Sequence, residues 1–191
     1  MKRRFAYCAI LCMLVSLVMN STLAYFTAEE TARNVITSGG IDIQVVERQQ
    51  TDDGLKPYPT DPIQVMPGSE VSKIVSVQNL DDPAWVRMAY SVTVVDADGT
   101  ERSLTSAEVQ QFMAVNADTA NWTYKDGWWY YADALTTGEE SKPLFTEVTF
   151  SGSGMGNAYH NNTILIDVMA QAVQQIHNGE TVMGAAGWPK G

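Results

Sequence analysis

The two histidines, His160 and His177, are the first candidates for metal or acid–base chemistry in this 191-residue chain. A helical zinc-peptidase site needs histidines four positions apart with a glutamate beside them, so that both imidazoles reach one metal ion. These two are 17 positions apart and lie near glycines and asparagines, which is typical of exposed loops. No Gly-x-Ser-x-Gly sequence offers a serine nucleophile, although a Ser-His-Asp triad assembles in space and the spacing leaves it open. The sequence predicts no catalytic residue, no metal site and no enzyme.

The segment 121–131 is the most aromatic part of the chain. Side chains alternate along a strand, so Trp128 and Tyr130 share one face while Trp129 and Tyr131 share the other. One face can join a core, and the opposite pair then needs a cover or a ligand. We therefore treat Trp129 and Tyr131 as candidate surface residues that stack on a wall or matrix polysaccharide. Packing of this pair against a neighbouring loop or subunit is the interpretation that we favour over such stacking.

Several carboxylates are candidates for calcium. The run Asp96-Ala97-Asp98-Gly99 resembles half of a calcium loop, but such a loop needs an acidic ligand two positions earlier, where Val94 stands. A hairpin turn is the better interpretation of that run. Two acidic pairs, Asp52-Asp53 and Asp81-Asp82, lie among turn residues, where oxygen ligands suit hard cations. The sequence predicts no cofactor and allows weak calcium binding.

The overall composition describes a packed, acidic protein. Hydrophobic residues make up 45% of the chain, and 22 acidic against 12 basic residues give a formal charge of −10. A negative surface repels phosphate backbones, so nucleic acid is not an expected partner. Both cysteines, Cys8 and Cys12, stand near the start, so the rest of the chain can form no disulfide.

The first 24 residues have the three regions of a signal peptide. Three basic residues, Lys2 to Arg4, precede an apolar run over residues 5–19, and small residues follow near Ala24. We expect a signal helix that is cleaved between Ala24 and Tyr25 or nearby, with an uncleaved anchor as the alternative. The protein is then secreted, and it meets the membrane only through this segment.

The rest of the chain alternates with a period of two, which predicts β-strands that bury one face. A single helix is expected after Thr105 or Ser106, because Glu108 completes a capping box and Val109, Phe112 and Met113 share a face. Turn pairs such as Asp98-Gly99 and Asp126-Gly127 separate the strands. These features predict an all-β sandwich. The expected strands cover residues 41–46, 71–79, 86–95, 128–132, 144–151 and 164–173.

A series of short motifs appears in a fixed order along the chain. They are Ala24-Tyr25-Phe26-Thr27, Ser38-Gly39-Gly40-Ile41-Asp42-Ile43, Val65-Met66-Pro67-Gly68-Ser69, Val77-Gln78-Asn79, and Ile164-Leu165-Ile166-Asp167-Val168-Met169-Ala170-Gln171-Ala172. This order resembles the TasA/camelysin family of exported Gram-positive proteins, whose signal peptides are cut by a SipW-type signal peptidase. The resemblance spans roughly residues 20–175, and Ala28 stands where many members have Asp.

The resemblance implies a jelly-roll β-sandwich over residues 41–191 and a place in the extracellular biofilm matrix or on the cell surface. It also implies assembly into oligomers or fibres, in which the extended segment 25–40 of one subunit adds a strand to the next. The strand-donation candidates are Tyr25, Phe26, Val35 and Ile36. The same segment could instead pair within its own sheet. Two other functions stay open: a carbohydrate- or wall-binding module, and a camelysin-like surface metallopeptidase.

Overall fold

The computed structural model describes residues 35–37, 41–60, 67–153 and 162–189. Their strands form two sheets within one compact unit of the chain. The predicted signal segment 1–24, its cleavage site at Ala24 and Tyr25, the donor candidate Phe26, and His160 lie outside the described residues. No described helix is long and apolar enough to span a membrane.

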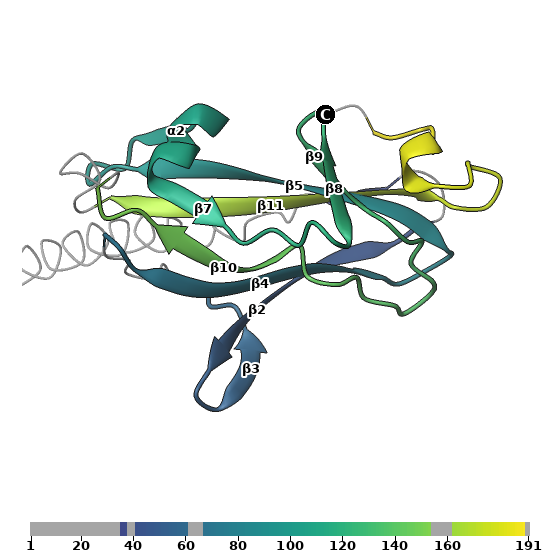
Figure 1. Ribbon diagram of the computed structural model, residues 1–191, viewed down its shortest axis with the longest axis horizontal. Coiled ribbons are helices and arrows are strands. Elements are labelled where there is room, and N and C mark those ends of the chain that lie inside the picture. Colours follow the sequence, from purple (N-terminus) through teal and green to yellow (C-terminus); the bar gives the residue numbers. More distant parts are fainter. Residues whose placement is uncertain (1–34, 38–40, 61–66, 154–161, 190–191) are drawn as a thin grey trace, which may run out of the picture. The chain divides into compact units, whose positions relative to one another are not determined.

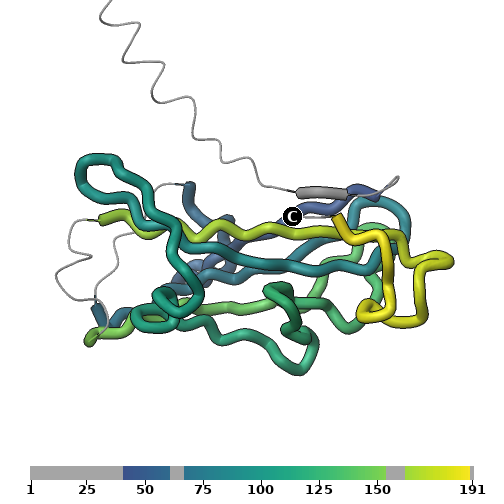
Figure 2. The backbone as a smooth tube through the Cα atoms, turned by 90° about the horizontal axis from the view of Figure 1, so that it is seen from above, coloured from purple at the N-terminus to yellow at the C-terminus, as the bar shows by residue number. Residues whose placement is uncertain are grey.

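The first sheet, here called sheet A, runs in the order β1-β11-β5-β9-β8, and β6 also pairs with β5. Every pairing in it is antiparallel except that of β1 with β11, which is parallel. β5 and β11 lie side by side over 12 residues each (Figure 2). The strands are β1 (Val35–Thr37), β5 (Ala84–Val95), β6 (Glu101–Ser103), β8 (Trp122–Lys125), β9 (Trp128–Tyr131) and β11 (Thr163–Gln174).

The second sheet, sheet B, is antiparallel and runs in the order β3-β2-β4-β10-β7. It forms the layer opposite sheet A (Figure 1). Its strands are β2 (Ile43–Thr51), β3 (Gly54–Pro57), β4 (Glu70–Asn79), β7 (Met113–Val115) and β10 (Phe145–Phe150). The prediction of an all-β fold with one short helix is therefore confirmed.

The core lies between the sheets and follows the period-two pattern. Val45 and Val77 of sheet B and Met88 and Ala172 of sheet A are each at most 2% exposed and belong to one cluster. Burying a side chain of valine or methionine size stabilises a fold by roughly 1.5–3 kcal/mol before the entropy of ordering is counted. The alternation read from the sequence therefore identifies the residues that join the two layers.

The single described α-helix, α2 (Ser106–Phe112), forms as its capping residues predict. The Thr105 side chain accepts a hydrogen bond from the backbone of Glu108, and the Glu108 carboxylate accepts one from the backbone of Thr105. These bonds satisfy donors that a helix start otherwise leaves unpaired. Val109 and Phe112 are buried, so the helix closes one end of the core.

Both predicted hairpin turns are present. Asp126 and Gly127 have φ values of 50° and 86°, and they join β8 to β9. Gly99, with φ of 85°, lies in the turn that joins β5 to β6. Positive φ at these positions matches the turn chemistry expected from the sequence. The four short strands β3, β6, β7 and β8 were not predicted. Three or four residues carry little alternation, and β9, which is equally short, was predicted from its run of aromatic residues.

Candidate functional site

The edge of sheet A beside β1 is the first candidate site. β1 pairs with only three residues of β11: Val35 is opposite Ala170, Ile36 opposite Gln171, and Thr37 opposite Ala172. The donor candidates Val35 and Ile36 therefore lie in a strand of their own chain in this structure. The pairing is parallel and short, and short edge strands are the least secured elements of a sheet.

The remainder of this edge has no strand partner among the described residues. Residues 163–169 of β11 pair with β5 on one side only. Their core-facing side chains, Ile164, Ile166 and Val168, pack against the main cluster but stay partly exposed. Beside β1, the corresponding Ala170 and Ala172 are both 0% exposed. Within the part of the chain that the structure describes, the edge thus offers backbone without a strand partner, together with apolar side chains that another strand would cover.

The aromatic hairpin of β8 and β9 requires a correction. Tyr131, predicted as a surface residue, is 6% exposed, its ring lies 5.0 Å from that of Trp122, and its hydroxyl accepts a hydrogen bond from the backbone of Lys142. Trp129 is opposite Met88 and packs against the same core. The pairing of β9 with β5 turns this face inward, so the two residues do not form an exposed stacking pair.

The exposed aromatic residue of the hairpin is Tyr124, which was not predicted as a surface residue from the sequence. Tyr124 is opposite Trp129, is 57% exposed, and its ring lies 5.0 Å from the Trp129 ring. Burial raises the pKa of the neighbouring Tyr90, and the proximity of Tyr124 raises it further. The sequence does contain a local indication of this aromatic pair: the register set by the Asp126-Gly127 turn places Tyr124 opposite Trp129, on the same face of the hairpin.

The opposite face of β9 contacts a buried arginine, Arg87, which was also not predicted from the sequence. Arg87 is 8% exposed, and no carboxylate of the described residues pairs with it. Its guanidinium lies 4.2 Å from the centre of the Trp128 ring and 4.6 Å from that of Trp188. Cation–π contacts and neutral acceptors therefore replace a counter-ion at this position.

The segment that covers Arg87 is residues 175–189, here called the C-terminal strap. It contains the short 3₁₀-helix η2 (Val182–Gly184) and turns back over this end of sheet A (Figure 2). A second apolar cluster forms beneath it, in which Val182 packs with Trp85, Tyr130 and Val173. The outer face of sheet A, which alternation marks as the wetter face, is therefore dry at this end.

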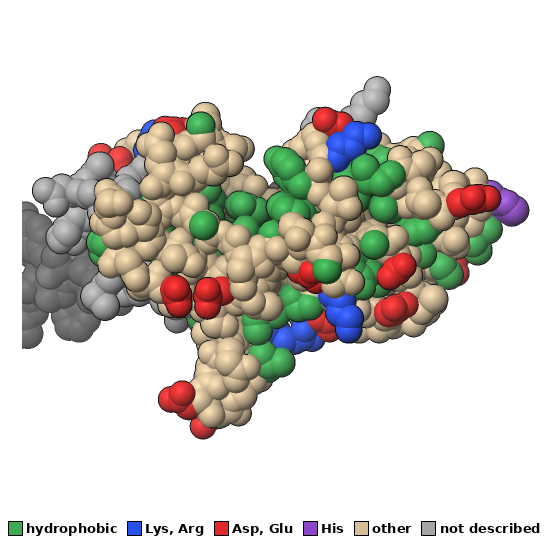
Figure 3. Space-filling model, in the orientation of Figure 1, with side chains coloured by type: hydrophobic (Ala, Val, Ile, Leu, Met, Phe, Trp, Pro, Cys, Tyr) green, Lys and Arg blue, Asp and Glu red, His purple; other side chains and the backbone are tan. Residues whose placement is uncertain are grey.

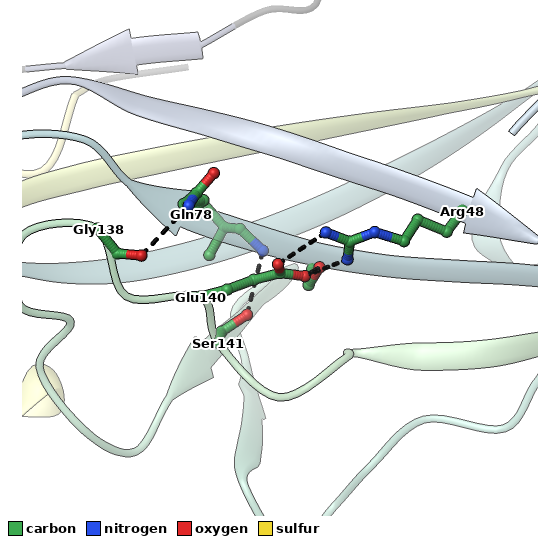
Figure 4. Close-up of polar contacts among 7 residues, drawn as sticks. Arg48, Gln78, Gly138, Glu140 and Ser141 are labelled. Atoms are coloured by element: carbon green, nitrogen blue, oxygen red, sulfur yellow. Dashed lines mark hydrogen bonds and ion pairs between the residues drawn. The ribbon is translucent and has the colours of Figure 1, made fainter. Parts of the chain in front are cut away.

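The outer face of sheet B carries a different polar group, centred on Glu140 (Figure 4). Arg48 donates two hydrogen bonds to the Glu140 carboxylate, at 2.5 and 2.8 Å, and Ser76 also donates to it. The bonds from Arg48 hold the pKa of Glu140 below its ordinary value. The side chains of Arg48 and Glu140 are about one-third exposed, at 35% and 30%. This group ties β2, β4 and the segment before β10 together.

The carboxylates of the two acidic loops are exposed to solvent. Asp52, Asp53, Asp81 and Asp82 are all exposed, and the first two lie at the acidic tip of the β2–β3 hairpin (Figure 3). Among the described residues, no three His, Cys, Asp or Glu side chains are close enough to share a metal ion. His177 is exposed in a turn with φ of 59°.

Comparison with known proteins adds no relative: no protein-family model, no curated protein and no solved structure matches the chain.

Proposed function

We propose that this protein is an exported structural subunit of the TasA-like kind, a non-enzymatic component of a biofilm matrix or cell surface. A SipW-type signal peptidase removes residues 1–24, and the sandwich adopts a jelly-roll arrangement outside a Gram-positive cell. The freed N-terminal segment of one subunit then takes the place of β1 on β11 of the next. This proposal rests on the resemblance of the sequence and on the geometry of the β11 edge.

The observation that carries the proposal is the contrast within β11. Its 12 residues pair fully with β5, yet β1 covers only three of them on the other side. A longer arm that continued along residues 163–169 would cover Ile164, Ile166 and Val168 and pair backbone that has no strand partner among the described residues. Adding a strand to an open edge combines main-chain hydrogen bonds with apolar burial, which is the physical basis of β-augmentation.

Exchange between subunits needs no new contact. The β1 of a second copy is chemically identical to the chain's own β1, so it can make the same three pairings. Concentration then decides which β1 occupies β11, because the intermolecular pairing gains by mass action. A three-residue strand has few bonds to break before such an exchange.

The proposal predicts that the chain beginning at Tyr25 forms oligomers or fibres, measured by light scattering and electron microscopy. Deleting residues 25–37 should stop assembly while the far-ultraviolet circular dichroism of the sandwich stays unchanged. The double substitution Val35→Pro with Ile36→Pro should have the same effect, because proline has no N–H for the ladder. Ala97→Pro, in the exposed β5–β6 turn, is the matched control. A chain that stays monomeric across concentration, pH and ionic strength would contradict the proposal.

A second candidate function is carbohydrate binding, and Tyr124 is the observation that favours it. Its exposed ring, supported by Trp129 at 5.0 Å, can stack on a sugar ring. Capture of the protein on insoluble wall or matrix glycan should be lost in Tyr124→Ala and kept in Leu55→Ala, which removes a comparably exposed side chain from β3. Equal capture of both variants would exclude this role for Tyr124.

The camelysin-like peptidase remains the third candidate from the sequence. Metal analysis together with casein digestion, with and without a chelator, tests it directly. Chelator-sensitive cleavage would establish it, whereas an absence of bound metal and of cleavage would remove it.

A further inference from the structure

Arg87 is the centre of a polar network that joins three parts of the chain. It lies opposite Gln171 of β11 and opposite Tyr130 of β9. Its Nε and Nη2 atoms both donate to Gln171 Oε1, at 2.9 and 2.6 Å, and Nη1 donates to the Tyr130 hydroxyl at 2.9 Å. Nη2 also donates to the Pro189 carbonyl of the C-terminal strap at 3.1 Å. The side chain thus links the strap to two strands of sheet A.

The strap supplies one of the three aromatic rings around Arg87, which are those of Trp128, Tyr130 and Trp188. Trp188 faces the guanidinium, and its ring packs edge-on against Tyr130 with centres 5.7 Å apart. If the strap leaves, Arg87 loses this ring and the Pro189 acceptor together. A guanidinium in partly open surroundings is then drawn toward water, since no described carboxylate holds it.

Gln171 depends on Arg87 for its polar partner. It is 0% exposed, its Oε1 accepts only from Arg87 among the described residues, and its Nε2 has no partner there. Displacing Arg87 would leave the whole amide buried without hydrogen bonds, a state that a local opening of β11 relieves. Gln171 is also the middle one of the three residues with which β1 pairs, opposite Ile36.

We infer that the C-terminal strap, acting through Arg87 and Gln171, controls how firmly β1 is held on β11. With the strap closed, the receptor segment 170–172 is fixed and keeps the chain's own β1. With the strap open, Gln171 loses its partner, β11 loosens at the β1 position, and β1 is released. This inference rests on the proposed function for its biological meaning, since it makes strap opening a regulatory step of strand exchange.

The strap can be opened without touching Arg87, Gln171 or β1. Gly179 has φ of 82°, and a Cβ at this position would lie 3.0 Å from the carbonyl carbon of Gly184. Gly179→Ala therefore disturbs both the left-handed turn and the close approach that folds the strap back. Asn178 holds the same fold through two bonds to Ala186, at 2.8 and 3.0 Å. Gly138, with φ of 80° and open space around it, gives the matched control Gly138→Ala.

The test is amide hydrogen exchange on the monomeric chain, comparing Trp188→Ala and Gly179→Ala with the wild type and with Gly138→Ala. Exchange of those amides of Val35–Thr37 that donate to β11 should rise by about tenfold or more in both strap variants and stay unchanged in the control. Amides of Val75 and Val77 in β4 report the core and should keep their protection.

Selective loss of protection in β1 supports the inference. It is overturned if β1 keeps its protection while Gly184 and Ala185 of the strap exchange rapidly, or if β1 and β4 lose protection equally. The measurement is independent of assembly, so a wild-type protein that never assembles would refute the proposed function and leave the coupling to be judged by exchange alone. If both proposals hold, the strap variants also assemble at lower concentration than the wild type.

Discussion

Two arginines on the outer faces of the two sheets are held in opposite ways. Arg48 on sheet B pairs with the Glu140 carboxylate, and its side chain is 35% exposed. Arg87 on sheet A is 8% exposed and is held by neutral acceptors and by the rings of Trp128 and Trp188. Arg48 makes a solvated ion pair, whereas Arg87 makes a buried network without any acid among the described residues.

The difference shows what the covering segment does. Burying an unpaired charge is expensive, so a guanidinium below 10% exposure persists only where every neighbour supplies an acceptor or a ring face. The C-terminal strap provides two of those neighbours, Trp188 and Pro189. Arg48 needs no such cover, because its guanidinium is hydrogen-bonded to Glu140 and its side chain is partly exposed to water. The strap therefore contributes to the stability of sheet A by holding the buried guanidinium of Arg87.

Truncation gives the largest expected contrast. Arg87→Ala leaves the amide of Gln171, the Tyr130 hydroxyl and the strap without their partner, so the free energy of unfolding should fall by about 3 kcal/mol. Arg48→Ala removes a partly solvated pair and should cost about 1 kcal/mol. Urea unfolding at neutral pH measures both losses. Equal losses would end the distinction between the two sites.

Replacement by lysine separates geometry from charge. An ammonium keeps the charge but cannot donate to Gln171, Tyr130 and Pro189 at once, so Arg87→Lys should cost about 2 kcal/mol. Arg48→Lys can still pair with Glu140 and should change the free energy of unfolding by less than about 0.5 kcal/mol. Urea unfolding of the two lysine variants tests this prediction. An Arg87→Lys variant with an unchanged free energy of unfolding would show that the planar guanidinium is not needed.

Of the two arginine sites, only that of Arg48 should lose stability in acid. The pKa of Glu140 lies below its ordinary value, mainly because of the hydrogen bonds from Arg48. A lowered carboxylate pKa contributes stability above the unfolded-state pKa, and this contribution is lost as pH falls through the folded-state pKa. The difference in the free energy of unfolding between the wild type and Arg48→Ala should therefore shrink toward zero as the pH falls below 4.5, the ordinary pKa of a glutamate.

No described carboxylate pairs with Arg87, so the loss in the free energy of unfolding caused by Arg87→Ala should keep its size over the same pH range. Unfolding curves at several pH values for the two variants decide the matter. An Arg87→Ala effect that also disappears in acid would reveal an acidic partner for Arg87.

The sequence predicted the main strands because their alternation is long. β5 and β11 each contribute 12 residues of period-two pattern, and the even-numbered members, such as Met88 and Ala172, form the core. The capping box at Thr105 and the turn at Asp126 are local signals that need no tertiary information. Features of this kind can be predicted from the chain alone.

The candidate sites were harder to predict because alternation does not say which face points inward. The pattern of β9 gave two equivalent faces, and only its pairing with β5 at Met88 assigns Trp129 and Tyr131 to the core. Arg87 lies on the face that alternation marks as wet, and it is dry because a segment about 100 residues later covers it. Such long-range cover leaves no local trace in the sequence.

The most direct test of the central claim asks whose β1 occupies β11 in an assembly. The chain that begins at Tyr25 contains no cysteine, so Val35→Cys in one isotopically labelled chain can be mixed with Ala170→Cys in an unlabelled chain. These positions are opposite each other in the β1–β11 pairing. After oxidation under assembling conditions, mass spectrometry should find a disulfide-linked peptide pair that joins a labelled residue 35 to an unlabelled residue 170. A third chain that carries both substitutions is the control for pairing within one subunit. If this chain forms the disulfide internally and the mixed single-cysteine chains never link, β1 stays in its own subunit and the proposed strand exchange is wrong.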